Sequence, residues 1–203
     1  MDNPKFIIIG LIVLLLIFGG VVWLFSRKGE QAQTTVDQNQ TAASNSGQQN
    51  PTQSDIKYWA TIKTAKGDIV MELYPKVAPK TVQNFIDKAN AKYFDGLKFH
   101  RAEDWVMQGG DPLSSDESKK AYWGTGGGNI DTELSGRPFV VGALGVARGQ
   151  DIKISNDSQF FIVKKDAQFL NNQYTLFGQV TAGMDVVQKI QIGDKILSIE
   201  IAQ

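Results

Sequence analysis

The stretch from Phe99 to Pro112 reads FHRAEDWVMQGGDP and holds the chain's single histidine, His100, directly beside Arg101. Neighbouring side chains of an extended segment point to opposite faces, so only one of the two can line a given groove. A lone histidine suggests acid–base chemistry, but the sequence offers His100 no partner suited to it. We therefore interpret His100 as a packing residue with satisfied hydrogen bonds.

Composition excludes several classes of protein. Lysine plus arginine and aspartate plus glutamate number 21 each, a balance without the basic excess of a general nucleic-acid binder. The lack of cysteine excludes disulfides, thiolate nucleophiles and cysteine-ligated zinc. The sequence has no G-x-S-x-G or H-E-x-x-H motif, and one histidine cannot build a His-rich metal site. We expect no metal and no cofactor.

Two further motifs have ordinary explanations. GTGGGNID, from Gly124 to Asp131, lacks the G-K-[ST] of a phosphate loop, so we interpret it as a tight loop whose glycines adopt positive φ. Glu103 and Asp104 would suit glycosidic chemistry as a carboxylate pair, but adjacent residues on a strand point apart. We interpret them as a solvated turn.

The chain divides into three parts. Residues 1–28 contain the uncharged apolar run from Phe6 to Phe25, which as a helix would span about 30 Å, the thickness of a bilayer core. A cleaved signal peptide is the alternative, but its apolar core would be shorter and no A-x-A-like site follows. Residues 29–55 are rich in Gln, Asn, Ser and Thr, which favours a flexible linker. Residues 56–203 are the folded domain.

We expect the protein to be attached to a membrane by a single N-terminal transmembrane helix. Lys5 on one side of the run, and Arg27 and Lys28 on the other, leave the charge bias nearly tied. Because the tail before the run is short and easily retained inside, we place the domain outside the cytoplasm. We expect it to be a monomer.

Short strands and two helices are predicted within the domain. The residues from Ile56 to Tyr74 alternate apolar and polar around Ala65–Asp68, which predicts a hairpin. Pro79 opens a helical pattern, and Met184–Ile190 forms a second. The apolar stripe of the first helix comprises Val82, Phe85, Ile86 and Ala89. The other predicted strands are Trp105–Gln108, Val140–Ala147, Gln159–Val163, Thr175–Val180 and Lys195–Ile201. This pattern favours a closed barrel plugged by helices.

Four motifs, in their order along the chain, resemble the cyclophilin family of peptidyl-prolyl isomerases. They are FHRAEDWVMQGGDP, GALGVARG (Gly142–Gly149), NDSQFFIV (Asn156–Val163) and FLNNQYTLFGQVTAGMDVV (Phe169–Val187). The resemblance runs from about Ile56 to Ala202. It implies a mainly β fold, a closed eight-stranded and mostly antiparallel barrel capped by two helices. It also implies a shallow groove that binds proline-containing polypeptides without a cofactor.

The resemblance implies a set of site residues as well. Arg101 would be the catalytic residue, and Phe161 would form the floor of the proline pocket, with Phe160 turned into the core. Gln108 would bind the substrate backbone and help to orient Arg101. The apolar walls would be Trp105, Val106, Phe169, Leu170 and Tyr174. The subsite before the proline would be lined by Ala147, Arg148 and Gln159.

Several positions depart from what is usual in that family. The segment from Arg101 to Gln108 is one residue shorter, so its turn must be rebuilt. Phe169 replaces the Trp of cyclosporin-sensitive members. Three other positions differ in residue type: Trp105 stands where Phe is common, Arg148 where Asn is common and Tyr174 where His is common.

We expect an enzyme, a membrane-tethered peptidyl-prolyl isomerase that acts on unfolded or newly exported proteins. The alternative is a non-catalytic module that holds proline-containing segments as a chaperone or scaffold. Arg101 favours the enzyme, because a pure binder needs no donor at the prolyl nitrogen.

Overall fold

The computed structural model describes residues 56–203, so the apolar run and the linker lie outside the described residues. Between residues 56 and 203, no helix is long and apolar enough to cross a bilayer. The strands are β1 (Tyr58–Thr64), β2 (Gly67–Leu73), β3 (Arg101–Ala102), β4 (Val106–Gly109), β5 (Asn129–Asp131), β6 (Ala143–Arg148), β7 (Ile154–Val163), β8 (Leu176–Ala182) and β9 (Ser198–Ala202). The helices are α1 (Pro79–Asn90) and α2 (Met184–Lys189), with 3-10 turns η1 (Pro112–Ser115), η2 (Glu117–Tyr122) and η3 (Gln168–Leu170).

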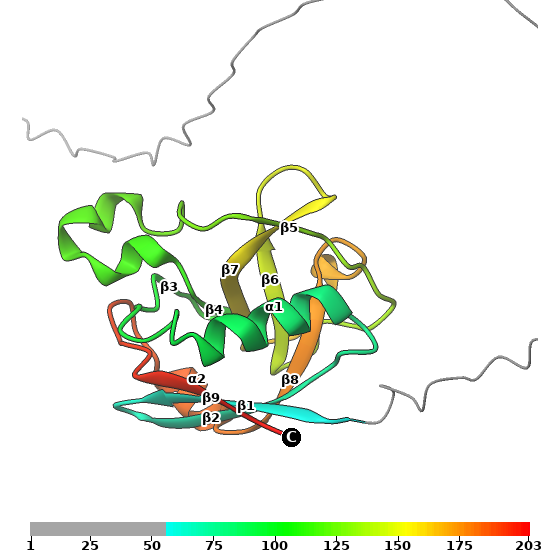
Figure 1. Ribbon diagram of the computed structural model, residues 1–203, viewed down its shortest axis with the longest axis horizontal. Helices are drawn as coiled ribbons and strands as arrows, with labels where there is room; N and C mark the ends of the chain where they lie inside the picture. The colour runs from blue at the N-terminus through cyan, green and yellow to red at the C-terminus, as the bar shows by residue number, and fades with distance from the viewer. Residues whose placement is uncertain (1–55) are drawn as a thin grey trace, which may run out of the picture. The chain divides into compact units, whose positions relative to one another are not determined.

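One antiparallel sheet contains all nine strands of the described domain. Eight follow the path β3-β4-β7-β6-β8-β2-β1-β9, and β5 adds to β7. The sheet curls so that β1, β2 and β9 lie below the strands β6, β7 and β8 (Figure 1). The prediction of a mainly β, antiparallel fold is confirmed.

Strand pairing does not close the barrel, which corrects the sequence-based expectation. The end strands β3 and β9 are not neighbours in the ladder. The segment just before β3 and the segment just before β9 are joined instead by irregular main-chain hydrogen bonds. Phe99 N donates to Asp194 O at 2.9 Å, and Ile196 N donates to Leu97 O at 2.8 Å. Side-chain packing and these few bonds replace a regular seam, so the sheet is an open, curled half-barrel.

Helix α1 lies across the sheet and closes its main core, as its apolar stripe predicts (Figure 1). Pro79 occupies the first turn, where its missing N–H costs no helical hydrogen bond. Phe85, at the centre of the buried face, packs its ring 5.3–5.6 Å from those of Phe94, Phe160 and Phe177. Helix α2 also forms where it is predicted and starts after Gly183, whose φ is +85°.

A second, smaller apolar cluster lies on the other face of β7. Phe160 belongs to the main core under α1, whereas Phe161 belongs to this second cluster together with Val106, Phe139 and Leu170. Successive residues of a strand point to opposite faces, so the pair Phe160–Phe161 divides between the two clusters as expected. The second cluster forms the base of the candidate site.

Candidate functional site

A cavity of about 110 Å³ opens above the second apolar cluster. It is bounded by β3, β4, β6 and β7, by η3 and by the segment before β8. Its lining residues are Arg101, Trp105, Val106, Gln108, Ala147, Arg148, Phe161, Leu170 and Tyr174. All of these are among the predicted site residues, although they come from distant parts of the chain.

The floor of this cavity is Phe161, held in place by two aromatic neighbours and a glycine. Its ring stacks on Phe139 with centroids 5.7 Å apart and meets Tyr174 edge-on at 5.8 Å. Gly145 pairs with Phe161 across β6 and β7. A Cβ at Gly145 would lie 2.3 Å from Phe161 Cζ and 2.7 Å from Phe139 Cε1, so only glycine leaves room for both rings. Sequence reasoning missed this role of Gly145.

Arg101 stands at the edge of the same cavity with its side chain 40% exposed. Both of the hydrogen bonds that its side chain makes within the described domain go to Glu103: Nε donates to Oε1 at 2.7 Å and Nη2 to Oε2 at 3.1 Å. The guanidinium carbon also lies 5.1 Å from the Trp105 ring centre. Glu103 is thus a neighbour of the predicted catalytic arginine and not merely part of a solvated turn.

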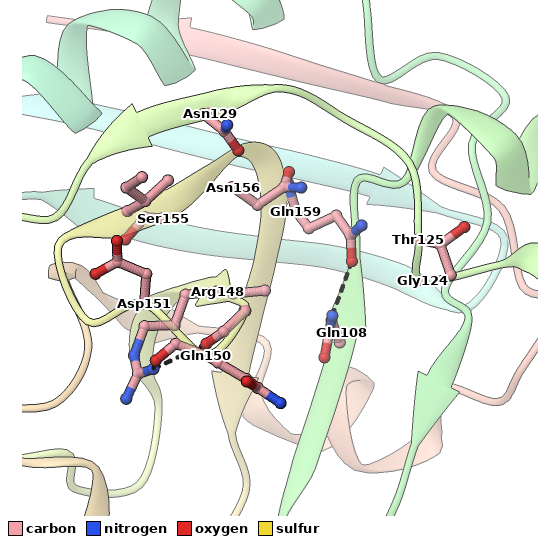
Figure 2. Close-up of a pocket in the computed structure, with 13 residues that line it drawn as sticks. Gln108, Gly124, Thr125, Asn129, Arg148, Gln150, Asp151, Ser155, Asn156 and Gln159 are labelled. Carbon is pink, nitrogen blue, oxygen red and sulfur yellow. Dashed lines mark hydrogen bonds between the residues drawn. The ribbon is translucent and has the colours of Figure 1, made fainter. Parts of the chain in front are cut away.

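Gln108 makes its side-chain hydrogen bond to Gln159. It faces Arg101 across the β3–β4 ladder, but its Nε2 donates to Gln159 Oε1 at 3.0 Å, as Figure 2 shows. Gln159 in turn donates from its own Nε2 to Gly126 O at 2.7 Å. The side chain of Gln108 makes no hydrogen bond to Arg101 in the described domain, where both side-chain hydrogen bonds of Arg101 go to Glu103. The orientation of Arg101 by Gln108 therefore stays a prediction.

A second cavity, of about 390 Å³, adjoins the first and shares Gln108, Ala147 and Arg148 with it. Gly124 and Thr125 lie on one side of it and Asp151 on the other, with Gln108 and Gln159 between them (Figure 2). Gln159 belongs to this cavity and not to the first. The two cavities together make one groove. Aromatic and aliphatic residues predominate around the first cavity, here called the apolar end, and polar residues around the second, here called the polar end.

The glycine-rich loop and Arg148 form walls of the polar end. Gly124 and Gly127 have φ of +93° and +97°, which confirms the interpretation of a tight loop. Arg148 Nε donates to Gln173 O at 2.7 Å and Nη1 to Gly149 O at 2.8 Å. Its guanidinium carbon lies 4.4 Å from the ring centre of Tyr174. Arg148 therefore braces two loops of the groove.

Comparison with known proteins assigns the family. Residues 59–201 match the family model described as cyclophilin type peptidyl-prolyl cis-trans isomerase/CLD. The chain belongs to the cyclophilin-type peptidyl-prolyl cis-trans isomerase family. This cyclophilin is 38% identical over 149 residues to a probable peptidyl-prolyl cis-trans isomerase of Brucella suis, covering 70% of this chain and 76% of that protein. It is 36% identical over 131 residues to the isomerase cypE of Dictyostelium discoideum, covering 64% and 82% respectively.

Solved structures of cyclophilins share the fold. A cyclophilin-type isomerase of Cryptosporidium parvum matches with a TM-score of 0.65 and 25% identity, covering 73% of this chain and 99% of that one. The same protein in the presence of the dipeptide Ala-Pro matches with a TM-score of 0.63, covering 71% and 99%. The assignment as a peptidyl-prolyl cis-trans isomerase thus agrees with the groove that the fold builds.

The position of Phe169 in this cyclophilin differs from expectation. Phe169 does not line the cavity of about 110 Å³: it is 68% exposed and stands edge-on to Trp105 at 5.2 Å, outside the wall to which Leu170 contributes. Residues 168–170 form one 3-10 turn, which turns these adjacent side chains in different directions.

His100 lines neither cavity, but its ring lies beside the groove residues Gly124 and Gln159, and its hydrogen bonds are not satisfied. Both ring nitrogens are buried without a hydrogen-bond partner in the described domain. Burial lowers the pKa of His100, and the nearby charge of Asp111 only partly opposes this. The ring is therefore neutral near pH 7 and unsuited to act as a general acid there.

Proposed function

We propose that Arg101 accelerates rotation about X–Pro bonds by donating a hydrogen bond to the prolyl nitrogen. Amide resonance sets a barrier of about 18–20 kcal/mol, and uncatalysed exchange takes roughly tens to hundreds of seconds. In the twisted transition state the nitrogen becomes pyramidal and recovers a lone pair. A donor aimed at that lone pair stabilises the transition state more than either planar ground state, so it raises turnover.

The observation that carries this proposal is the position of Arg101 at the rim of the Phe161 cavity. Nη1 of Arg101 makes no hydrogen bond to any residue between 56 and 203, while Nε and Nη2 are engaged by Glu103. A guanidinium stays charged and holds its donors in a rigid plane. The free end of Arg101 is thus available to a peptide whose proline ring rests on Phe161.

The two cavities suit the two parts of such a peptide. The apolar cavity would take the proline ring, and the polar cavity would take the residues before it. Ala147, which lines both cavities, would lie beside the peptide bond that rotates. Rotation breaks no covalent bond and requires neither nucleophile nor metal. A cyclophilin-type protein solved in the presence of Ala-Pro supports proline peptides as the ligand class.

The test is the turnover of Arg101→Ala on a proline tetrapeptide. Losing a transition-state donor of this kind costs about 2.7–4 kcal/mol, or roughly two orders of magnitude or more in kcat. Peptide affinity should change much less, because the Phe161 cavity remains. Arg137→Ala is the matched control, since Arg137 lies over the Tyr74 ring at 4.2 Å and outside the groove. A kcat that stays unchanged while binding weakens would reject this role of Arg101. A lack of turnover in the unmodified domain would support the non-catalytic peptide holder.

We also propose that the domain is held at a membrane, facing unfolded or newly exported proteins outside the cytoplasm. The support is the apolar run from Phe6 to Phe25, long enough to span a bilayer. The full chain should sediment with membranes, resist salt and alkali, and dissolve in detergent. Protease added outside sealed cells should reach the domain. A mature N-terminus beyond Ser26 would replace the anchor with a signal peptide.

A further inference from the structure

Glu103 occupies one edge of the guanidinium of Arg101. Its two carboxylate oxygens accept from Nε at 2.7 Å and from Nη2 at 3.1 Å. The second oxygen also accepts from the indole Nε1 of Trp105 at 2.9 Å. One carboxylate therefore joins the arginine at the cavity rim to an aromatic wall of the same cavity.

The chain geometry explains why these three side chains meet. Arg101 and Glu103 are two residues apart, so on an extended strand they point to the same face. The short turn after β3 then brings Trp105 back beside them, because Glu103 N donates to Val106 O at 2.8 Å.

The main chain that carries Glu103 is itself tied to the neighbouring loop. Lys164 Nζ donates to Glu103 O at 2.9 Å, and Lys164 N donates to Trp105 O at 2.7 Å. The carboxylate is thus mounted on a fixed piece of backbone. A bidentate hydrogen bond to a carboxylate held in this way defines the plane of the guanidinium as well as its position.

A contribution to folding stability does not explain the ion pair between Arg101 and Glu103. The side chains of Arg101 and Glu103 are 40% and 47% exposed, and ion pairs this open to water add little to folding. The guanidinium holds the pKa of Glu103 below its usual range, chiefly through their hydrogen bond. The carboxylate is consequently ionised throughout the neutral range and can hold the arginine there at all times.

We propose that Glu103 is a positioning residue that fixes the guanidinium of Arg101 toward the prolyl nitrogen. This inference rests on the proposed role of Arg101. Without the carboxylate, the flexible arginine side chain would populate several rotamers, of which only some reach the substrate. The negative charge of Glu103 also weakens the arginine's attraction for a lone pair, but water screens that effect at this exposed site. Orientation is therefore the larger effect.

The experiment compares Glu103→Ala and Glu103→Gln with the matched control Asp104→Asn. Asp104 lies in the same turn with a side chain 96% exposed, and it pairs only loosely with Lys165 at 3.8 Å. Mispositioning of a catalytic group predicts an about tenfold lower kcat for Glu103→Ala with KM changed less than about twofold. Glu103→Gln keeps one acceptor and should lose less. Asp104→Asn should match the unmodified protein, and thermal melts should be alike for all four.

A spectroscopic readout separates positioning from any general effect on activity. In the unmodified protein the Arg101 Nε–H should give a distinct, slowly exchanging NMR signal, assigned by its loss in Arg101→Ala. Glu103→Ala should move that signal to the position of a solvated arginine, and Asp104→Asn should leave it in place. An unchanged signal, or a kcat equal to or above that of the unmodified protein, overturns the proposal.

The same set of variants distinguishes the two proposals. If Arg101→Ala retains full turnover, the role of Arg101 fails, whatever Glu103 does to the NMR signal. If Arg101→Ala is slow and Glu103→Ala is not, only the role of Glu103 fails. When both hold, the double variant should turn over no more slowly than Arg101→Ala alone, since Glu103 acts only through the arginine.

Discussion

Replacing Gly145 by alanine should damage the floor of the cavity from beneath. The new Cβ would lie 2.3 Å from Phe161 Cζ and 2.7 Å from Phe139 Cε1. Carbon atoms pack at about 3.5–4.0 Å, so the Phe161 ring must move by about 1 Å or more. Phe139 stacks on the same ring and is itself almost fully buried, which leaves the open cavity as the direction in which Phe161 can move.

Two effects of known size follow from that shift. Overpacking of a dense core costs about 1–3 kcal/mol, which lowers Tm by roughly 2–12 °C for a domain of this size. The displaced ring also takes up part of a cavity of only about 110 Å³. Proline-peptide affinity should therefore fall, and kcat/KM should fall up to about 100-fold, the scale of a 1 Å misplacement.

The assay for Gly145→Ala combines thermal unfolding, peptide titration and isomerase kinetics. Gly136→Ala is the matched control: it lines neither cavity, and a Cβ there would meet no atom within 4 Å. We expect the control to match the unmodified protein in all three measurements. Wild-type stability together with wild-type peptide affinity in Gly145→Ala would refute the assignment of Phe161 as a floor fixed by this glycine.

Two other changes test features of the same region. Burial lowers the pKa of His100, so its contribution to stability is complete above the unfolded value of about 6.5 and is lost as the pH falls below it, because the unfolded chain then binds the extra proton. His100→Asn should flatten the decrease in urea stability between pH 7 and 5 and should leave the pH dependence of activity near neutrality unchanged. An undiminished decrease in stability would assign that decrease to other groups. Phe169 has no N–H to donate, so we predict weak cyclosporin inhibition that Phe169→Trp tightens by about 2- to 10-fold, the value of one hydrogen bond. Nanomolar inhibition of the unmodified domain would count against this reasoning.

Residues whose environment depends on local chain geometry were predictable from the sequence. The stripe of α1 follows from helical periodicity, and the opposite burial of Phe160 and Phe161 follows from strand alternation. Strand β7 was only half predicted, because its first residues, from Ile154 to Asp157, are largely polar and pair with the short strand β5. Strand β3, two residues long, carries too little pattern to detect.

The part of the site that the sequence did not reveal depends on cross-strand neighbours. Gly145 matters because a side chain there would collide with the rings of Phe161, 16 residues later in the chain, and Phe139, 6 residues earlier. No local sequence pattern indicates these contacts. Glu103 was interpreted as a solvated turn residue because it adjoins Asp104 and adjacent residues on a strand point apart. Only its contacts with Arg101 and Trp105, which the sequence does not show, distinguish it. Phe169 was misplaced because the turn η3 has no strand or helix periodicity over three residues.

The hairpin from Arg101 to Gln108 carries the proposed catalytic residue, its partner Glu103 and the cavity-lining residues Trp105 and Val106 within one short stretch of chain. Its two strands are joined in fixed register, with Arg101 opposite Gln108 and Ala102 opposite Met107. The length of the turn between the two strands of this hairpin then determines where Glu103 lies relative to Arg101. If the proposed pairing holds, adding one residue to this turn would move the Glu103 carboxylate away from the guanidinium of Arg101, so we expect the length of this turn to set how firmly the arginine is held.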